Sequence, residues 1–227
     1  MAANPDFIYQ PQMRPYLDII YHDNDIVVVN KSSGLLTVSG RLPEHQDCLE
    51  SRVHKVLPTA SIVHRLDMAT SGIMVMALNK PAHVAISRQF EKRLTQKSYI
   101  ARVFGKIEKA QGSVEQPLMS DWPNRPKQKI DHQQGKAALT HYKVLSYCKD
   151  IDGQTSTLVE LTPITGRSHQ LRVHMLWLGH PILGDRLYAH EQALAMSSRL
   201  QLHAQMLQIS HPVTAQTLTF SKACPFD

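Results

Sequence analysis

The chain has few cysteines and no long apolar run. Its 227 residues include only Cys48, Cys148 and Cys224, an odd number without CxxC spacing. Such usage favours reduced thiols in a cytosol over a disulfide framework or a zinc site. No stretch approaches the ~18 apolar residues of a membrane-spanning helix, and the first twenty residues carry prolines and charges instead of an apolar core. We therefore expect a cytoplasmic protein that is neither secreted nor inserted in a membrane.

Several common catalytic motifs are also absent. The sequence has no GxxxxGKS/T, GxGxxG, GxSxG or HExxH, so nucleotide hydrolysis, dinucleotide binding, serine hydrolysis and zincin chemistry lack their usual scaffolds. Thirteen histidines suggest a metal site. However, His169 and His174 are five residues apart on a predicted helix and so lie on different faces. We predict no metal site.

Acidic residues are scarce around one aspartate. Asp67 is the single acid between Glu50 and Glu91. The same window holds five cations, namely Arg52, Lys55, Arg65, Lys80 and Arg88. Nearby positive charge favours an ionised carboxylate, so we predict that Asp67 is an anion able to attack a carbon or accept a proton. An ordinary surface aspartate or a helix N-cap is the alternative.

A second acid-free stretch runs from Leu161 to Gly184. Within it, Arg172 lies between Leu171 and Val173 on a predicted helix with an apolar face. A buried arginine needs a partner because an unpaired buried charge is costly, and we propose Asp67 as that partner. The alternative is a surface arginine whose aliphatic stem covers its own helix.

The net charge favours a polyanionic partner. Lysine and arginine outnumber aspartate and glutamate by 25 to 19, which gives a formal charge of +6 and a pI near 9.3. Nucleic acid fits this balance. Two prolines and three cations predict an exposed loop over residues 120–129. Its cations, Arg125, Lys127 and Lys129, are expected to contact phosphates as a cluster, although any one of them alone is more often a solvated charge.

The apolar pattern predicts an α+β fold. We expect strands over residues 26–29, 73–78, 99–103, 139–147, 157–162, 200–209 and 217–220, and helices over 81–93 and 168–178. A turn over residues 150–153 joins two of these strands as a hairpin. Strands without strict helix alternation favour a mixed, mainly antiparallel sheet with flanking helices. Residues 1–20 are predicted to form an N-terminal tail and residues 21–227 a single domain.

Three motifs resemble the signature blocks of the RluA-type pseudouridine synthases. They are HRLDMATSG at residues 64–72, KSYIA at 97–101 and TGRSHQLRVH at 165–174, and GHPILGD follows at 179–185. The NKSSGL turn at 30–35 resembles another block, with Ser32 where proline is usual. These blocks keep the order and spacing of the family. The resemblance implies the pseudouridine synthase fold with a central catalytic cleft, and we expect no N-terminal S4 domain.

The resemblance implies an isomerase that converts uridine to pseudouridine in RNA without a cofactor or metal. It makes Asp67 the catalytic aspartate, Arg172 its partner and Tyr99 an aromatic residue against the base, although the residues alone predict a core position for Tyr99. Arg65 is expected to follow the flipped base. The motifs and the basic loop supply the predicted substrate- and RNA-binding residues, which are His64, Arg65, Leu171, Arg167, His169, Arg125, Lys127 and Lys129.

The resemblance suggests two substrates, a 23S rRNA hairpin loop and a tRNA anticodon stem-loop, and we expect a monomer. The first step stays open: Asp67 attacks C1′ of the ribose, adds to C6 of the uracil or removes the C2′ proton. Two other functions are weighed. A non-catalytic RNA-binding or assembly protein explains the charge but leaves Asp67 without a role, and a nucleoside hydrolase would release free uracil.

Overall fold

The computed structural model describes residues 8–149 and 153–226. The chain divides into two compact units. The terminal unit comprises residues 8–97 and 203–225, and the central unit comprises residues 98–202 together with Phe226. The predicted α+β fold with a mixed, mainly antiparallel sheet is confirmed. A single domain over residues 21–227 stays a prediction. Among the described residues, no helix combines the length and apolar composition that a membrane crossing needs.

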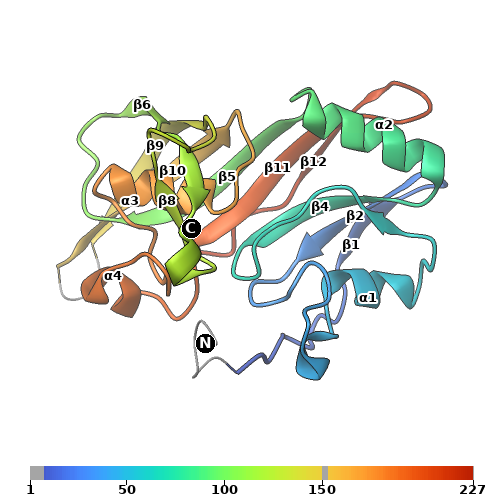
Figure 1. Ribbon diagram of the computed structural model, residues 1–227, viewed down its shortest axis with the longest axis horizontal. Coiled ribbons are helices and arrows are strands. Elements are labelled where there is room, and N and C mark those ends of the chain that lie inside the picture. The colour runs from blue at the N-terminus through green and yellow to red at the C-terminus, as the bar shows by residue number, and fades with distance from the viewer. Residues whose placement is uncertain (1–7, 150–152, 227) are drawn as a thin grey trace. The chain divides into compact units, whose positions relative to one another are not determined.

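The terminal unit contains a mixed sheet in the order β1-β2-β4-β11 (Figure 1). β12 pairs with β11, and β3 pairs with β4. All of these pairs are antiparallel except β4 with β11, which is parallel. The bounds are β1 Ile19–His22, β2 Ile26–Lys31, β3 Ser61–Ile62, β4 Ser71–Ala77, β11 Leu202–Ser210 and β12 Thr217–Ser221. The first strand thus begins inside the range predicted as a tail.

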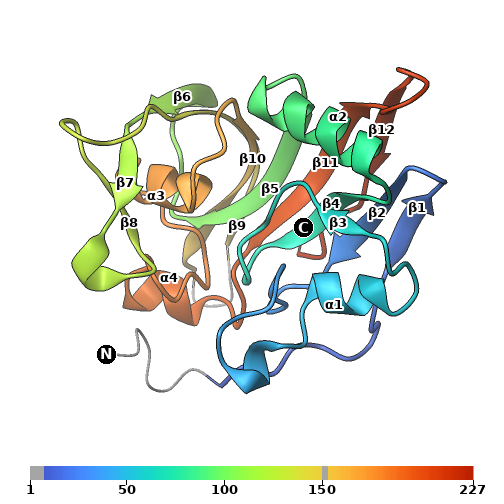
Figure 2. The same cartoon turned by 45° about the vertical axis from the view of Figure 1, so that its right-hand side comes forward.

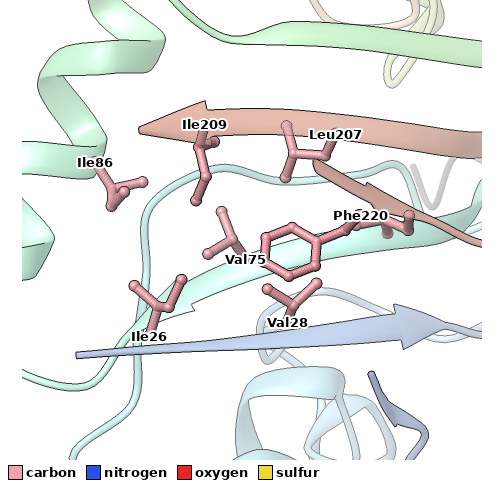
Figure 3. Packing of buried hydrophobic residues seen from close by; sticks show 8 residues of the cluster. Ile26, Val28, Val75, Ile86, Leu207, Ile209 and Phe220 are labelled. Carbon is pink, nitrogen blue, oxygen red and sulfur yellow. The ribbon is translucent and has the colours of Figure 1, made fainter. Parts of the chain in front are cut away.

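β2 and β4 are buried along almost their whole length, which explains why their sequences are nearly continuous apolar runs. Helix α2 (Lys80–Glu91) covers them, and Asn79 begins it by accepting a hydrogen bond from the Ala82 amide at 2.9 Å. Figure 3 shows Ile86 of α2 beside Ile26, Val75 and Ile209 of this core. The core residues are Ile26, Val28, Ile73, Val75, Ile86, Leu207, Ile209 and Phe220.

The remaining elements of the terminal unit are short. A 3-10 helix, η1, spans Pro43–His45, and helix α1 spans Leu49–His54. Cys48 begins α1 because its sulfur accepts from the Ser51 amide, while the Ser51 hydroxyl oxygen accepts from the Cys48 amide. Cys48 is buried and belongs to this cap. The sequence pattern predicts neither of these two helices.

The central unit contains an antiparallel sheet in the order β5-β10-β9-β6. Its strands are β5 Gln96–Phe104, which begins in the terminal unit, β6 Gln111–Glu115, β9 Leu139–Lys149 and β10 Thr155–Pro163. The predicted pairing of β9 with β10 is confirmed, and residues 150–152 of its turn lie outside the described residues. Helices α3 (Gln170–Trp177) and α4 (Glu191–Ala195) follow. Figure 2 shows α3 beside a small hairpin of this unit.

That hairpin corrects the prediction of a plain loop over residues 120–129. β7 (Leu118–Ser120) pairs with β8 (Gln128–Ile130) around a 3-10 helix, η2 (Trp122–Asn124). Leu118 lies opposite Ile130, and both pack with Val173 of α3. This apolar contact closes the base of the hairpin, whereas the polar composition of its tip predicted only a loop.

Candidate active site

Asp67 lies half-buried in the loop that precedes β4, as the sequence predicts. The segment after β2 holds the backbone carbonyls on both sides of it. The Thr37 hydroxyl donates to the Leu66 carbonyl at 2.7 Å, and the Gly34 amide donates to the Met68 carbonyl at 2.9 Å. The Ser33 hydroxyl donates to Ala69 at 2.6 Å. These bonds restrict the backbone around the carboxylate, so its position is set before any substrate arrives.

Lys31 at the end of β2 also holds this loop through hydrogen bonds. Its side chain is fully buried, and its ammonium donates to the carbonyls of Ser32 at 2.9 Å, Leu35 at 2.7 Å and Met68 at 2.9 Å. A buried ammonium is tolerated when its N–H groups find acceptors. Lys31 therefore fastens the turn after β2 to the residue that follows Asp67. The sequence does not predict this role; the one local signal is that Lys31 follows the β-branched run of residues 26–29 by two positions.

His64 supports the other side of the loop. Its Nε2 accepts a hydrogen bond from the Val75 amide at 3.1 Å, and its ring stacks on Phe90 with centroids 4.4 Å apart. Burial, followed by the positive charge of Lys97, lowers the pKa of His64 to about 3, and burial also lowers the pKa of Lys97. An accepting Nε2 and this pKa both require a neutral imidazole at physiological pH. His64 thus fixes the chain three residues before Asp67.

Arg172 is buried on α3, as its apolar neighbours predict, and the structure supplies a partner that the sequence analysis missed. Its Nε lies 2.8 Å from Asp185 Oδ2 and its Nη2 lies 2.7 Å from Oδ1. Both side chains are at most 5% exposed. Asp185 is the first acid after the stretch from Leu161 to Gly184, so its position ending that stretch was the available signal. The pairing of Arg172 with Asp67 stays a prediction.

Tyr188 joins three parts of the central unit. Its ring centroid lies 5.0 Å from the guanidinium carbon of Arg172. Its hydroxyl accepts from the Gln128 amide at 2.7 Å and shares a hydrogen bond with Nδ1 of His169 at 2.7 Å. His169 has a left-handed backbone, with φ of 53°, and α3 begins after it instead of at Ser168. The phenol therefore ties the β7–β8 hairpin and the start of α3 to the arginine.

The hairpin tip carries the predicted basic residues. Arg125 and Lys129 are exposed and Lys127 is half-buried. Trp122 is 67% exposed, and the guanidinium carbon of Arg125 lies 3.9 Å from its ring centroid. An aromatic face beside cations is an arrangement that binds nucleic acid. The sequence predicts the cations at this position but no role for Trp122.

One group of side chains in the terminal unit has metal-ligating chemistry. Oxygens of Asp23 and Asp25 and a nitrogen of His211 lie within 4.8 Å of one another. Hydrogen bonds within the protein already use these atoms. Asp23 accepts from the amides of Asp25 and Ile26, from the Tyr21 hydroxyl and from His211 Nε2 at 3.0 Å. The group therefore closes a turn at the start of β2.

Comparison with known proteins identifies the family. A model described as RNA pseudouridylate synthase matches residues 25–177. The dual-specificity RNA pseudouridine synthase RluA of Escherichia coli K12 is 53% identical over 218 residues, which cover 96% of this chain and 98% of that protein. The chain belongs to the RNA pseudouridylate synthase family. It is an isomerase that converts uridine to pseudouridine in RNA.

Another curated relative and two solved structures support the same family. The dual-specificity RNA pseudouridine synthase RluA of Yersinia pestis is 55% identical over 208 residues, which cover 92% of this chain and 99% of that protein. The structure of human RNA Pseudouridylate Synthase Domain Containing 1 matches with a TM-score of 0.80 and 31% identity, over 96% of this chain and 87% of that one. Human RNA Pseudouridylate Synthase Domain Containing 4 gives a TM-score of 0.72 and 26% identity, over 92% and 89%.

The predicted site residues of this synthase fall into two sets. The terminal unit carries His64, Arg65 and Asp67, of which Arg65 is exposed. The central unit carries Tyr99, Arg125, Lys127, Lys129, Arg167, His169, Leu171 and Arg172. Tyr99 is half-buried on β5 opposite Leu161 of β10, Leu171 is 7% exposed, and Arg167 Nε donates to the Ala137 carbonyl at 3.2 Å. Their roles in catalysis and RNA binding stay predictions.

Proposed function

We propose that this synthase uses Asp67 to isomerise specific uridines in two stem-loops, a 23S rRNA hairpin and a tRNA anticodon stem-loop. The observation that carries the proposal is the support of the Asp67 loop, whose flanking carbonyls bind Lys31, Ser33, Gly34 and Thr37. A half-buried carboxylate on such a loop is preorganised for chemistry. Two substrates accord with the dual specificity that names the relatives from Escherichia coli and Yersinia pestis.

The reaction needs an ionised carboxylate and no redox partner. The bond between ribose C1′ and uracil N1 breaks and a bond from C1′ to C5 forms. The C5 proton leaves to solvent and N1 gains a proton, so no electrons are gained or lost overall. Asp67 starts this sequence by attacking C1′, by adding to C6 or by removing the C2′ proton, and the same anion serves all three. Because these steps need no redox group, we propose that the enzyme works without metal or cofactor. We also propose that it acts as a monomer in the cytoplasm.

The other residues bind and position the RNA. A uridine within a stem-loop has to be flipped out of its stack at a cost of a few kcal/mol. We assign Arg65 to the space left by the flipped base, Tyr99 to its face and Arg172 to the orientation of Asp67. Arg65 is exposed, as a residue that follows a base has to be. Cations of the hairpin tip hold the phosphates.

Substrate RNA tritiated at uracil C5 tests the proposal. We expect tritium to enter the solvent while the base stays on the RNA. Release of free uracil would instead indicate a hydrolase, and RNA binding without either product would indicate a binding protein. Asp67→Asn should abolish tritium release while RNA binding persists, whereas the control Glu91→Gln, on the exposed end of α2, should match the wild type. An equal loss of RNA binding in Asp67→Asn would contradict the catalytic assignment.

Cells that lack the protein test the choice of RNA. Pseudouridine mapping should show one site missing from 23S rRNA and one from tRNA anticodon stem-loops. Complementation with the wild type should restore both sites, and complementation with Asp67→Asn should restore neither. Loss of a site from only one class of RNA would overturn dual specificity and leave the isomerase assignment standing.

A further inference from the structure

Trp122 is an unusually exposed aromatic residue. It stands at the first position of η2, at the tip of the β7–β8 hairpin, with 67% of its surface open to solvent. Tryptophan is highly buried on average, so a ring left in water forgoes a large favourable burial. Arg125 lies over the ring at 3.9 Å. The pair presents a flat, polarisable surface next to a positive charge.

The loop that carries Trp122 is held in shape before any partner binds. The Asn124 amide donates to the Asp121 carbonyl at 2.9 Å, the Lys127 amide to the Asn124 carbonyl at 3.0 Å, and the Asp121 amide to the Lys127 carbonyl at 2.9 Å. Tyr188 anchors the end of the loop through the Gln128 amide. A preorganised aromatic side chain loses little conformational entropy on binding, which favours a role in recognition.

The charge of the tip selects the chemistry of the partner. Arg125, Lys127 and Lys129 stand within eight residues of Trp122. Two acids lie near them: Asp121 accepts a hydrogen bond from the Asn124 side-chain amide at 2.9 Å, and Asp131 Oδ2 lies 3.6 Å from Lys129 Nζ. Cations attract phosphates, and an aromatic face stacks with any nucleobase. A single-stranded stretch of RNA offers both groups together, whereas a paired duplex hides its base faces.

We propose that Trp122, backed by Arg125, is a stacking platform for one unpaired base of the substrate RNA that is not the reacting uridine. A reacting uridine has to be shielded from water, whereas Trp122 stands in solvent. This inference rests on the proposed function, because the bound base belongs to the substrate stem-loop. Trp122 then determines affinity and the choice of RNA loop, and takes no part in the chemical step.

Binding of an anticodon stem-loop RNA tests the platform. Trp122→Ala should raise Kd and KM by about 5- to 160-fold, since stacking contributes about 1 to 3 kcal/mol per base, and kcat should not change. Trp122→Phe should retain part of the affinity. The matched control is Trp177→Ala at the end of α3, the other tryptophan of the chain, which is 51% exposed. Equal Kd values for Trp122→Ala and the wild type, with matching thermal melts, would overturn the proposal.

Two further measurements separate stacking from charge and locate the base. The salt dependence of Kd should be unchanged in Trp122→Ala, which loses no cation, and weaker in Lys127→Ala. In a Trp177→Phe background, RNA should quench the fluorescence of Trp122. An abasic nucleotide at one loop position should remove this quenching, and should weaken binding to the protein that retains Trp122 far more than binding to Trp122→Ala. The proposal would be overturned if no loop position gave this effect, or if the position that gave it were the target uridine itself.

The failure of this inference can be told apart from the failure of the proposed function. Tritium release by the wild type is measured on the same RNA. If the wild type releases tritium and Trp122→Ala binds and reacts equally well, the platform is wrong and the function stands. If the wild type releases no tritium from any stem-loop, the proposed function is wrong. If RNA quenches Trp122 fluorescence but no abasic nucleotide removes the quenching, Trp122 contacts only the phosphate backbone and the platform is wrong.

Discussion

Arg172 and Asp185 form a two-pronged ion pair inside the central unit, with Nε 2.8 Å from Oδ2 and Nη2 2.7 Å from Oδ1. The Asp185 carboxylate also accepts from the Leu187 amide at 3.0 Å and the Tyr188 amide at 3.3 Å. One acid therefore fixes both the guanidinium and the turn that carries Tyr188. Asp185 therefore positions the Arg172 guanidinium, and any catalytic role of Arg172 depends on Asp185.

Asp185→Asn should destabilise the protein strongly. It leaves the charge of Arg172 buried without its carboxylate, which costs about 3 to 5 kcal/mol. Urea unfolding followed by circular dichroism measures the change. Glu108→Gln makes the same replacement of acid by amide in an exposed pair with Lys106 and should leave the unfolding midpoint where it is. Similar midpoints for the two variants would contradict the burial of the Arg172 pair.

His64 should make folding stability fall at acid pH. Its pKa is about 3 in the folded protein and 6.5 ordinarily, so between these values the unfolded chain binds a proton that the folded chain does not. Stability is then complete above pH 6.5 and is lost as the pH falls toward 3. His64→Gln keeps an acceptor for Val75 and should flatten the profile by about 1.4 kcal/mol per pH unit between about pH 6 and 4.

The control for the pH profile is His132→Gln, which replaces an exposed histidine. Its unfolding free energy should follow that of the wild type at each pH. A wild-type profile that runs parallel to that of His64→Gln would mean that the folded protein takes up the proton on His64, and the hydrogen bond from Val75 would then have to break.

Gly72→Ala should be far more damaging than Gly34→Ala. Both glycines have positive φ, 119° and 82° respectively. A Cβ at Gly72 would lie 2.3 Å from the carbonyl oxygen of Ala204, whereas a Cβ at Gly34 would have no neighbouring heavy atom within 4 Å. Backbone strain alone costs about 1 to 2 kcal/mol, and the clash adds about 1 to 3 kcal/mol. Chemical denaturation compares the two, and equal losses would contradict the close approach of β4 and β11.

Tyr188→Phe should cost about 1 to 2 kcal/mol of unfolding free energy, because it removes the hydrogen bonds of the hydroxyl to the Gln128 amide and to His169 Nδ1. The ring under Arg172 is retained. Tyr147→Phe is the matched control, since the Tyr147 hydroxyl donates one hydrogen bond to the Ile107 carbonyl at 2.8 Å and its side chain is 47% exposed. It should lose clearly less. The reverse order in guanidinium melts would remove Tyr188 from the network.

Local sequence patterns predicted most strands and the place of Asp67. The β-branched run of β2 and the apolar run of β4 give nearly complete burial on both faces, which the sequence signals without help from tertiary contacts. The position of Asp67 followed because the loop directly precedes one of these runs. The burial of Arg172 followed in the same way from Leu171 and Val173.

Partners that are distant in sequence could not be predicted in this way. Lys31 binds Met68 across 37 residues, and Arg172 binds Asp185 across 13. A lysine or aspartate alone has the pattern of a surface charge, and only the fold shows which acceptors it meets. The β7–β8 hairpin was missed because three strand residues on each side are too short for periodicity, and its contact with Val173 is tertiary.

The pairing of β4 with β11 has a consequence for synthesis on the ribosome. Residues 98–202 emerge as one continuous unit, but the loop that carries Asp67 precedes a strand whose parallel neighbour begins at Leu202. Translation therefore delivers the central unit before the parallel partner of β4 exists, although its antiparallel partners β2 and β3 are already made. A nascent chain that ends before Leu202 contains Asp67 but lacks the strand that pairs in parallel with β4, so we expect it to be inactive until β11 has been made.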